Sequence, residues 1–307
     1  MSSFLDDFRY TWYKPENGLS RLLIINIAVF VILSLLWLFS KFAGDMTVYE
    51  FVQEQLGLSS RPSTFLLKPW TFITYFFTHY DFFHILSNML GLYWFGLILQ
   101  DFVGSKKLVS LYFLGGLAGA TAYLLAYNFI PYFAHHEALL VGASGGVFAV
   151  VVGAATFTPD TKLFLLFFGP VKIKYLAVVY VFLSLLGTAG ANAGGSIAHL
   201  GGALLGYIFV KQLRRGNDWG KPLHLFFDFI SQVFKPKPKM KVTYRRDKAY
   251  AGKTTTSHQK SYSCDLSAQG VPDQETIDAI LDKISEQGYD KLTTEEKQIL
   301  FKASQKR

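Results

Sequence analysis

Charge is scarce over most of this sequence, and cysteine is almost absent. Asp, Glu, Lys and Arg make up 17% of the 307 residues, against about 25% in soluble domains, and hydrophobic residues make up 51%. Charged residues are rare between Leu22 and Val210 but frequent after Arg215. This distribution indicates a membrane domain followed by a polar tail. The lone Cys264 excludes an intramolecular disulfide framework.

The formal net charge of +8 does not indicate a nucleic-acid partner. The basic residues gather next to the apolar segments, and the sequence carries no RNA- or DNA-binding motif. We therefore expect no nucleic acid among the partners.

Six apolar segments approach the ~20 residues that a transmembrane helix needs. They lie at residues 21–42, 82–101, 108–130, 143–158, 171–189 and 195–213. The fourth is short and rich in glycine, so its first residues need not reach the membrane surface. The sequence therefore predicts an all-α, polytopic membrane protein with a bundle of six transmembrane helices.

The distribution of Lys and Arg predicts the orientation of these spans. Most of the basic residues fall on the side that holds both chain ends: Arg9, Lys14, Lys106, Lys107, Lys162, Lys172, Lys174, Lys211, Arg214 and Arg215. The other side has only Lys41, Arg61 and Lys68. By the positive-inside rule both ends are cytoplasmic, and we expect the plasma (inner) membrane of a bacterial cell.

Four polar side chains interrupt the apolar spans near their outer ends. His84 and Asn88 lie in "FFHILSNMLG", Ser144 in "VGASGGVF" and His199 in "GGSIAHLGG". The second, fourth and sixth spans all run from outside to inside, so these side chains should meet at one depth. Polar groups are costly in a bilayer, and such a cluster indicates a functional site.

Each of these residues also has a plain structural explanation. An intramembrane Ser commonly bonds a carbonyl of its own helix, a His can be a packing residue, and glycines can serve helix packing alone. The pattern Gly142-x-Ser144-x-Gly146 also fits the nucleophile elbow of soluble hydrolases, but no strand precedes Ser144. Around His135, His136 and Glu137 the motif H-E-x-x-H is absent and no further ligand is positioned, so we expect no metal there.

A serine and a histidine at one depth support nucleophilic catalysis. His199 has the chemistry to take the Ser144 hydroxyl proton and return it to a leaving amine. His84, Asn88 and the Ser144 backbone N–H would donate to the developing oxyanion. The supporting glycines, which let two helices approach closely, are Gly142, Gly145, Gly146, Gly202 and Gly206. No carboxylate is placed to complete a triad, so we predict a dyad.

The segments "HILSN", "GASGG" and "AHLGGALLG" resemble the three signatures of the rhomboid intramembrane serine proteases, over roughly residues 20–213. The resemblance implies a Ser144 nucleophile, a His199 base, no cofactor, and cleavage of other membrane proteins near the outer end of a span. It also implies a fifth span that gates entry and a mobile cap at residues 187–195.

Two features differ from that family. Phe148 stands where the family often has a Tyr packed on the catalytic His, and residues 43–69 lack its common Trp-Arg pair. The alternatives to a protease are a catalytically inactive rhomboid-like binding factor or chaperone, and a transporter. The transporter is disfavoured because spans 82–101 and 195–213 carry no polar residues toward their inner ends.

The sequence divides into a cytoplasmic segment at 1–20, a membrane domain at 21–213 and three further parts. Residues 214–248 are amphipathic and basic, suited to anionic lipid or to a solvated linker. Residues 249–270 form a flexible linker, and 271–307 form a two-helix tail with a capping box at Thr293 and Glu296. Two such helices bury too little surface to be stable alone, so we expect them to dock on a partner or on the cytoplasmic loops.

Overall fold

A computed structural model describes residues 17–133, 136–165, 168–234 and 274–304. The chain divides into two compact units, Met1–Pro238 and Lys239–Arg307. The predicted basic stretch from residue 235 to 248, the linker at 249–270 and most of the segment at 1–20 lie outside the described residues.

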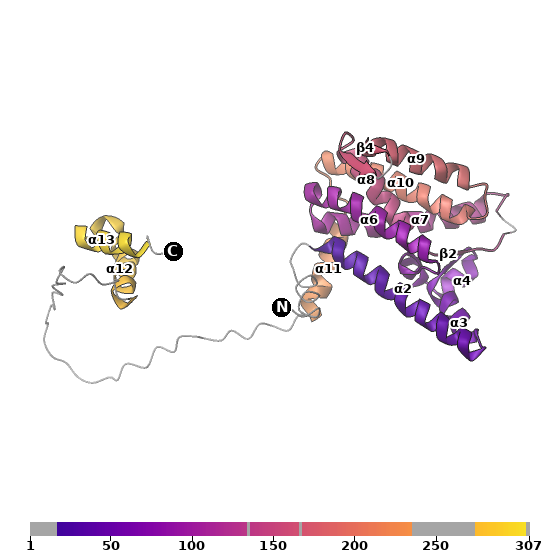
Figure 1. Cartoon of the computed structure of the whole chain (residues 1–307), viewed down its shortest axis with the longest axis horizontal. Helices are drawn as coiled ribbons and strands as arrows, with labels where there is room; N and C mark the ends of the chain where they lie inside the picture. The colour runs from indigo at the N-terminus through magenta and orange to yellow at the C-terminus, as the bar shows by residue number, and fades with distance from the viewer. Residues whose placement is uncertain (1–16, 134–135, 166–167, 235–273, 305–307) are drawn as a thin grey trace. The chain divides into compact units, whose positions relative to one another are not determined.

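The first unit is a bundle of helices that match the six predicted spans (Figure 1). Four are long and apolar enough to cross a membrane: α2 (Gly18–Ala43), α6 (Phe82–Val103), α7 (Ser105–Phe129) and α10 (Ala193–Arg214). Two are shorter: α8 (Ser144–Phe157) and α9 (Ile173–Gly187). The prediction of an all-α membrane protein is confirmed, and the predicted boundaries hold to within a few residues.

Helix α8 forms the centre of the bundle. It packs against α6, α7, α9 and α10, and each of its residues from Ser144 to Val151 is buried. Its 14 residues correspond to ~21 Å of helix, less than the ~30 Å hydrocarbon core. The start of α8 therefore lies below the membrane surface when its end is near the opposite face, as its length in the sequence predicted.

Short elements of the first loop hold the segment that leads into α8. They are α3 (Thr47–Leu56), β1 (Leu58–Ser59), α4 (Pro62–Leu67), α5 (Thr71–Thr74) and the 3-10 turn η1 (Tyr75–Phe77). Strand β1 pairs antiparallel with β2 (Leu139–Leu140), with Leu58 opposite Leu140. Helix α3 covers the stretch "TVYEFVQEQL", in which apolar and polar residues are interspersed.

On the far side of α8, an antiparallel hairpin of β3 (Lys162–Leu165) and β4 (Gly169–Lys172) leads into α9. Helix α11 (Lys221–Phe234) follows α10 and contacts α7. The ring of Phe227 lies 5.0 Å from that of Phe113, and Asp228 forms an ion pair with Lys106 at 2.6 Å.

The second unit contains α12 (Gln274–Gln287), the turn η2 (Tyr289–Lys291) and α13 (Thr294–Ser304). The predicted capping box is present: the Glu296 N–H donates to the Thr293 hydroxyl, and the Thr293 N–H donates to the Glu296 carboxylate. On α12, Ile280 is buried, whereas Leu281 is 49% exposed. An exposed Leu is consistent with a surface that two helices alone cannot cover.

Candidate active site

Ser144 is the first residue of α8, and two backbone hydrogen bonds hold the segment before it. The Gly142 N–H donates to the Tyr75 carbonyl at 2.9 Å, and the Ala143 N–H donates to Nε2 of His79 at 3.2 Å. Ser144 itself is only 7% exposed. The helix start that carries the hydroxyl is therefore fixed by the segment Tyr75–His79.

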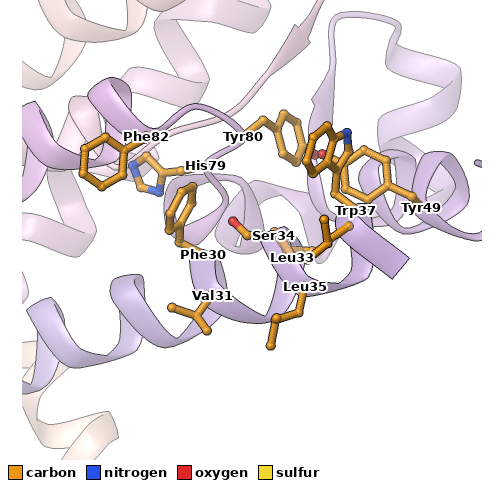
Figure 2. Close-up of a pocket in the computed structure, with 11 residues that line it drawn as sticks. Phe30, Val31, Leu33, Ser34, Leu35, Trp37, Tyr49, His79, Tyr80 and Phe82 are labelled. Atoms are coloured by element: carbon orange, nitrogen blue, oxygen red, sulfur yellow. The ribbon is translucent and has the colours of Figure 1, made fainter. Parts of the chain in front are cut away.

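His79 is completely buried and was missed in the sequence analysis. It also contributes to the wall of a mainly apolar cavity of about 470 Å³ against α2, where it lies near Phe30 and Phe82 (Figure 2). Its ring packs against that of His84 with the centroids 5.1 Å apart. His79 thus connects three features: the cavity, the His84 ring and the backbone before Ser144.

Gly142 has a different role from the one predicted. It lies in the loop and not in a helix, with φ +115°, a conformation that only glycine adopts readily. A Cβ on Gly142 would also lie 2.8 Å from Nε2 of His84. Gly142 therefore lets the imidazole of His84 approach the backbone next to Ser144.

Asn88 is buried on α6, one turn after His84. Its side-chain nitrogen donates to the His84 carbonyl at 2.8 Å. An amide nitrogen carries two N–H groups, so this bond orients the side chain and uses one of its two donors.

His199 lies on α10 with its imidazole stacked on the ring of Phe148, at 4.2 Å between centroids and 8° between planes. Phe148 is one helical turn after Ser144, so the stacked His199 lies near the first turn of α8. The structure therefore places His84 of α6 next to Gly142 and His199 of α10 next to Phe148, on either side of Ser144 in the sequence.

The close approach of α8 and α10 depends on two glycines of α10. A Cβ on Gly202 would collide with the carbonyl of Gly145, and one on Gly206 with the carbonyl of Ala149. A Cβ on Gly145, by contrast, would meet its nearest neighbour at an ordinary 3.4 Å. Of the predicted supporting glycines, Gly202 and Gly206 make the approach possible, and Gly145 contributes its carbonyl.

Two residues of α9 complete the surroundings of His199 and were also missed. The hydroxyl of Ser184 lies 3.1 Å from Nδ1 of His199, and the Tyr180 ring contacts Phe148 edge-on at 5.8 Å. Ser184 stands in "VFLSLLG", a polar residue among apolar ones. The criterion that selected Ser144 would have selected it too.

This arrangement provides a buried hydroxyl, an imidazole and several N–H donors around the start of one helix. Within the described part of the chain, no three His, Cys, Asp or Glu residues gather as metal ligands do. The fold and the site define a polytopic helical membrane protein with a serine and a histidine on adjacent buried helices.

Comparison with known proteins gives the family. Residues 67–215 match the Rhomboid domain, and residues 268–306 match a family of unknown function (DUF6576). The chain is therefore a member of the rhomboid family, which includes serine proteases and proteins that act on membrane protein substrates.

Three curated relatives show the extent of the likeness. RHOMBOID-like protein 12, mitochondrial, of Arabidopsis thaliana is 35% identical over 48% of this chain and 47% of its own length. Rhomboid protein 1, mitochondrial, of Saccharomyces cerevisiae is 31% identical over 65% of this chain and 55% of its own. The human presenilin-associated rhomboid-like protein, mitochondrial, is 27% identical over 66% and 52%. The chain spans about half the length of these relatives.

These relatives contradict one prediction from the sequence. We expected the plasma membrane with cytoplasmic chain ends, whereas the three relatives are mitochondrial proteins by name. The positive-inside rule orients spans across a membrane but does not say which membrane it is. The expected location was therefore wrong.

Proposed function

We propose that this protein is an intramembrane serine endopeptidase that cleaves transmembrane segments of other membrane proteins with a Ser144–His199 dyad. The observation that carries the proposal is the His199 imidazole stacked on Phe148, one turn from Ser144. Stacking fixes the plane of the imidazole, and a general base needs a fixed plane to accept a proton from a fixed hydroxyl.

Acylation begins when the Ser144 hydroxyl oxygen attacks the substrate carbonyl carbon and its proton passes to Nε2 of His199. The carbonyl electron pair moves to oxygen, which His84, Asn88 and the Ser144 N–H stabilise. Ser144 opens α8, so its N–H has no acceptor within the helix and can serve an external oxygen. The C–N bond then breaks as the amine takes the proton from His199, and water repeats the sequence to release the acid.

The depth of the site determines the substrate class. Because α8 starts below the membrane surface, the scissile peptide has to come from a segment that enters the membrane. An α-helix hides its peptide carbonyls in hydrogen bonds, so that segment must unwind locally before attack. We expect substrates with Gly, Pro or other weak helix formers near the end of the span on the Ser144 side.

Two further contacts are proposed for the parts outside the core. Helix α11 exposes Leu225, Phe226 and Phe229 while Lys106 and Phe113 hold it against α7, which suits a helix lying in the lipid interface. The tail unit keeps Leu281 and Phe301 exposed, which fits docking on a partner protein. The names of the relatives point to a mitochondrial membrane as the location.

A serine-reactive fluorophosphonate probe tests the proposed chemistry without a known substrate. We expect the detergent-purified chain to be labelled at Ser144, with labelling lost in Ser144→Ala and reduced at least 100-fold in His199→Ala. Ser110→Ala, which removes another buried hydroxyl, should label like the wild type. Absence of labelling in folded wild-type protein would contradict the protease and favour the rhomboid-like binding factor.

A further inference from the structure

Helix α9 contacts His199 and its stacking partner Phe148 from one face. Tyr180 and Ser184 are four residues apart and therefore neighbours on the helix surface. Tyr180 meets the ring of Phe148, and the Ser184 hydroxyl meets Nδ1 of His199 at 3.1 Å. The imidazole is thus held by stacking on α8 and by a hydrogen bond with a third helix.

Burial along α9 sets Ser184 apart from the rest of the helix. Only Ile173, Ala177 and Ser184 are buried in it; Leu176 and Val181 are half-buried, and its remaining large apolar side chains are exposed. The exposed ones are Tyr175, Val178, Val179, Tyr180, Phe182, Leu183, Leu185 and Leu186. A buried hydroxyl in an apolar surrounding is costly without a partner, and the His199 ring nitrogen supplies one.

The proposed general-base role gives this bond its direction. A neutral imidazole carries its proton on one nitrogen, and only the other nitrogen can act as a base. The 3.1 Å contact suits either donor, and the proposed base needs Nε2 without a proton. Nδ1–H of His199 then donates to Ser184, and Nε2 is left without a proton.

We propose that Ser184 is a positioning residue for His199, which holds the imidazole in the tautomer whose Nε2 accepts the Ser144 proton. This inference rests on the proposed function and assigns a third side chain to a site that the motifs describe as a dyad. When Nε2 takes the Ser144 proton, Nδ1 keeps its own, and Ser184 accepts a hydrogen bond from the imidazolium until Nε2 protonates the leaving amine. The proton count is balanced at each step, and no co-reactant is needed.

Ser184 lies on a different helix from both Ser144 and His199. The orientation of the imidazole consequently depends on where α9 lies. A substitution at Ser184 should therefore act on kcat, because it changes the base and leaves the substrate-binding surface intact.

Nitrogen-15 NMR of His-labelled protein tests the hydrogen bond independently of catalysis. The measurement uses the Ser144→Ala full chain, with the His199 signal assigned by its loss in His199→Gln. We expect a predominant Nδ1–H tautomer when Ser184 is present and a shift toward Nε2–H in Ser184→Ala. Ser184→Thr keeps a hydroxyl and should keep the Nδ1–H signature. Ser184→Val, which matches Thr in size but lacks the hydroxyl, replaces the alanine variant if that variant does not fold. An identical His199 signature with and without the hydroxyl overturns the inference whatever the activity.

Steady-state cleavage of a reconstituted substrate then measures the consequence. Ser184→Ala should lower kcat about tenfold with KM unchanged, the size expected for one hydrogen bond to a reacting group. Ser184→Thr should recover most of the rate, and Ser110→Ala should match the wild type. A wild-type kcat in Ser184→Ala overturns the positioning role. A wild-type chain that cleaves nothing while showing the Nδ1–H signature overturns the proposed function and leaves the Ser184 bond in place.

Discussion

The imidazole of His199 lies flat against the ring of Phe148, 4.2 Å away and within 8° of parallel. Phe148 belongs to α8 and His199 to α10, so this contact fixes the histidine relative to the helix that starts at Ser144. The stack needs an aromatic ring and makes no use of a hydroxyl. Phe148 therefore fills the position where rhomboids often have Tyr.

Replacing Phe148 tests the value of the stack. Phe148→Ala removes the contacts with His199 and Tyr180, and we expect kcat/KM to fall roughly 10- to 100-fold because the base loses its fixed orientation. Phe148→Tyr keeps the ring and should stay within about threefold of the wild type. Substrate cleavage rates measure both, and an alanine variant as active as the tyrosine variant would contradict the assignment.

Gly145 of α8 and Gly202 of α10 face each other, and substitution by alanine should affect stability differently at the two positions. Gly202→Ala places a Cβ into the Gly145 carbonyl, so we expect a loss of about 1–3 kcal/mol in stability and a lower thermal midpoint. Gly145→Ala meets ordinary contact distances and should leave the midpoint unchanged or raise it, because alanine favours a helix over glycine. Equal melting of the two variants in detergent would refute this asymmetry.

Nε2 of His79 accepts a hydrogen bond from the Ala143 N–H. A substitution that keeps an acceptor at this position should therefore do less harm than one that removes it. His79→Leu leaves the buried Ala143 N–H without a partner, which costs about 1–3 kcal/mol and loosens the segment before Ser144. His79→Gln supplies an amide oxygen and should recover part of both stability and fluorophosphonate labelling. Wild-type labelling by the leucine variant would show that this bond does not hold the site.

Asp160 lies outside the membrane-spanning segments, and its ion pairs should make the thermal stability depend on pH. Hydrogen bonds from Lys172 and Lys174 lower the pKa of its exposed carboxyl to about 2. Because the folded-state pKa lies below the unfolded value, the ionised Asp160 carboxylate stabilises the fold fully above the unfolded pKa of about 4. This stabilisation is lost as the pH falls toward 2. The difference in thermal midpoint between wild type and Asp160→Asn should therefore be small at pH 7 and vanish near pH 2. High salt should also reduce it, and a difference that persists at pH 2 would contradict the ion pair as its cause.

The helical fold was largely predictable because each span has to carry its own apolar run. Even the short helix α8 was visible, since the apolar residues after Ser144 end near Phe157. Helices α2 and α10 begin two or three residues before the predicted spans, because their first turns contain polar or weakly apolar residues such as Gly18 and Ser20 in α2 and Gly194 in α10. The location was not predictable, since the same spans fit different membranes.

The candidate site likewise contains residues that local motifs predict and residues whose roles depend on tertiary packing. Ser144, His199, His84 and Gly202 stand in motifs whose spacing brings them together. The roles of His79 and Gly142 depend on how the first loop packs beneath the start of α8, which no local pattern encodes. Ser184 was visible as a polar residue in an apolar span, but its partner became evident only when α9 and α10 were seen side by side.

The most direct test of the account compares wild type, Ser144→Ala and His199→Ala after reconstitution with a panel of single-span membrane proteins, with the products sized by mass spectrometry. The account predicts cleavage within or beside the span by the wild type, and its loss in both variants. Cleavage that persists in Ser144→Ala at the wild-type rate and position would contradict the proposed catalytic role of Ser144.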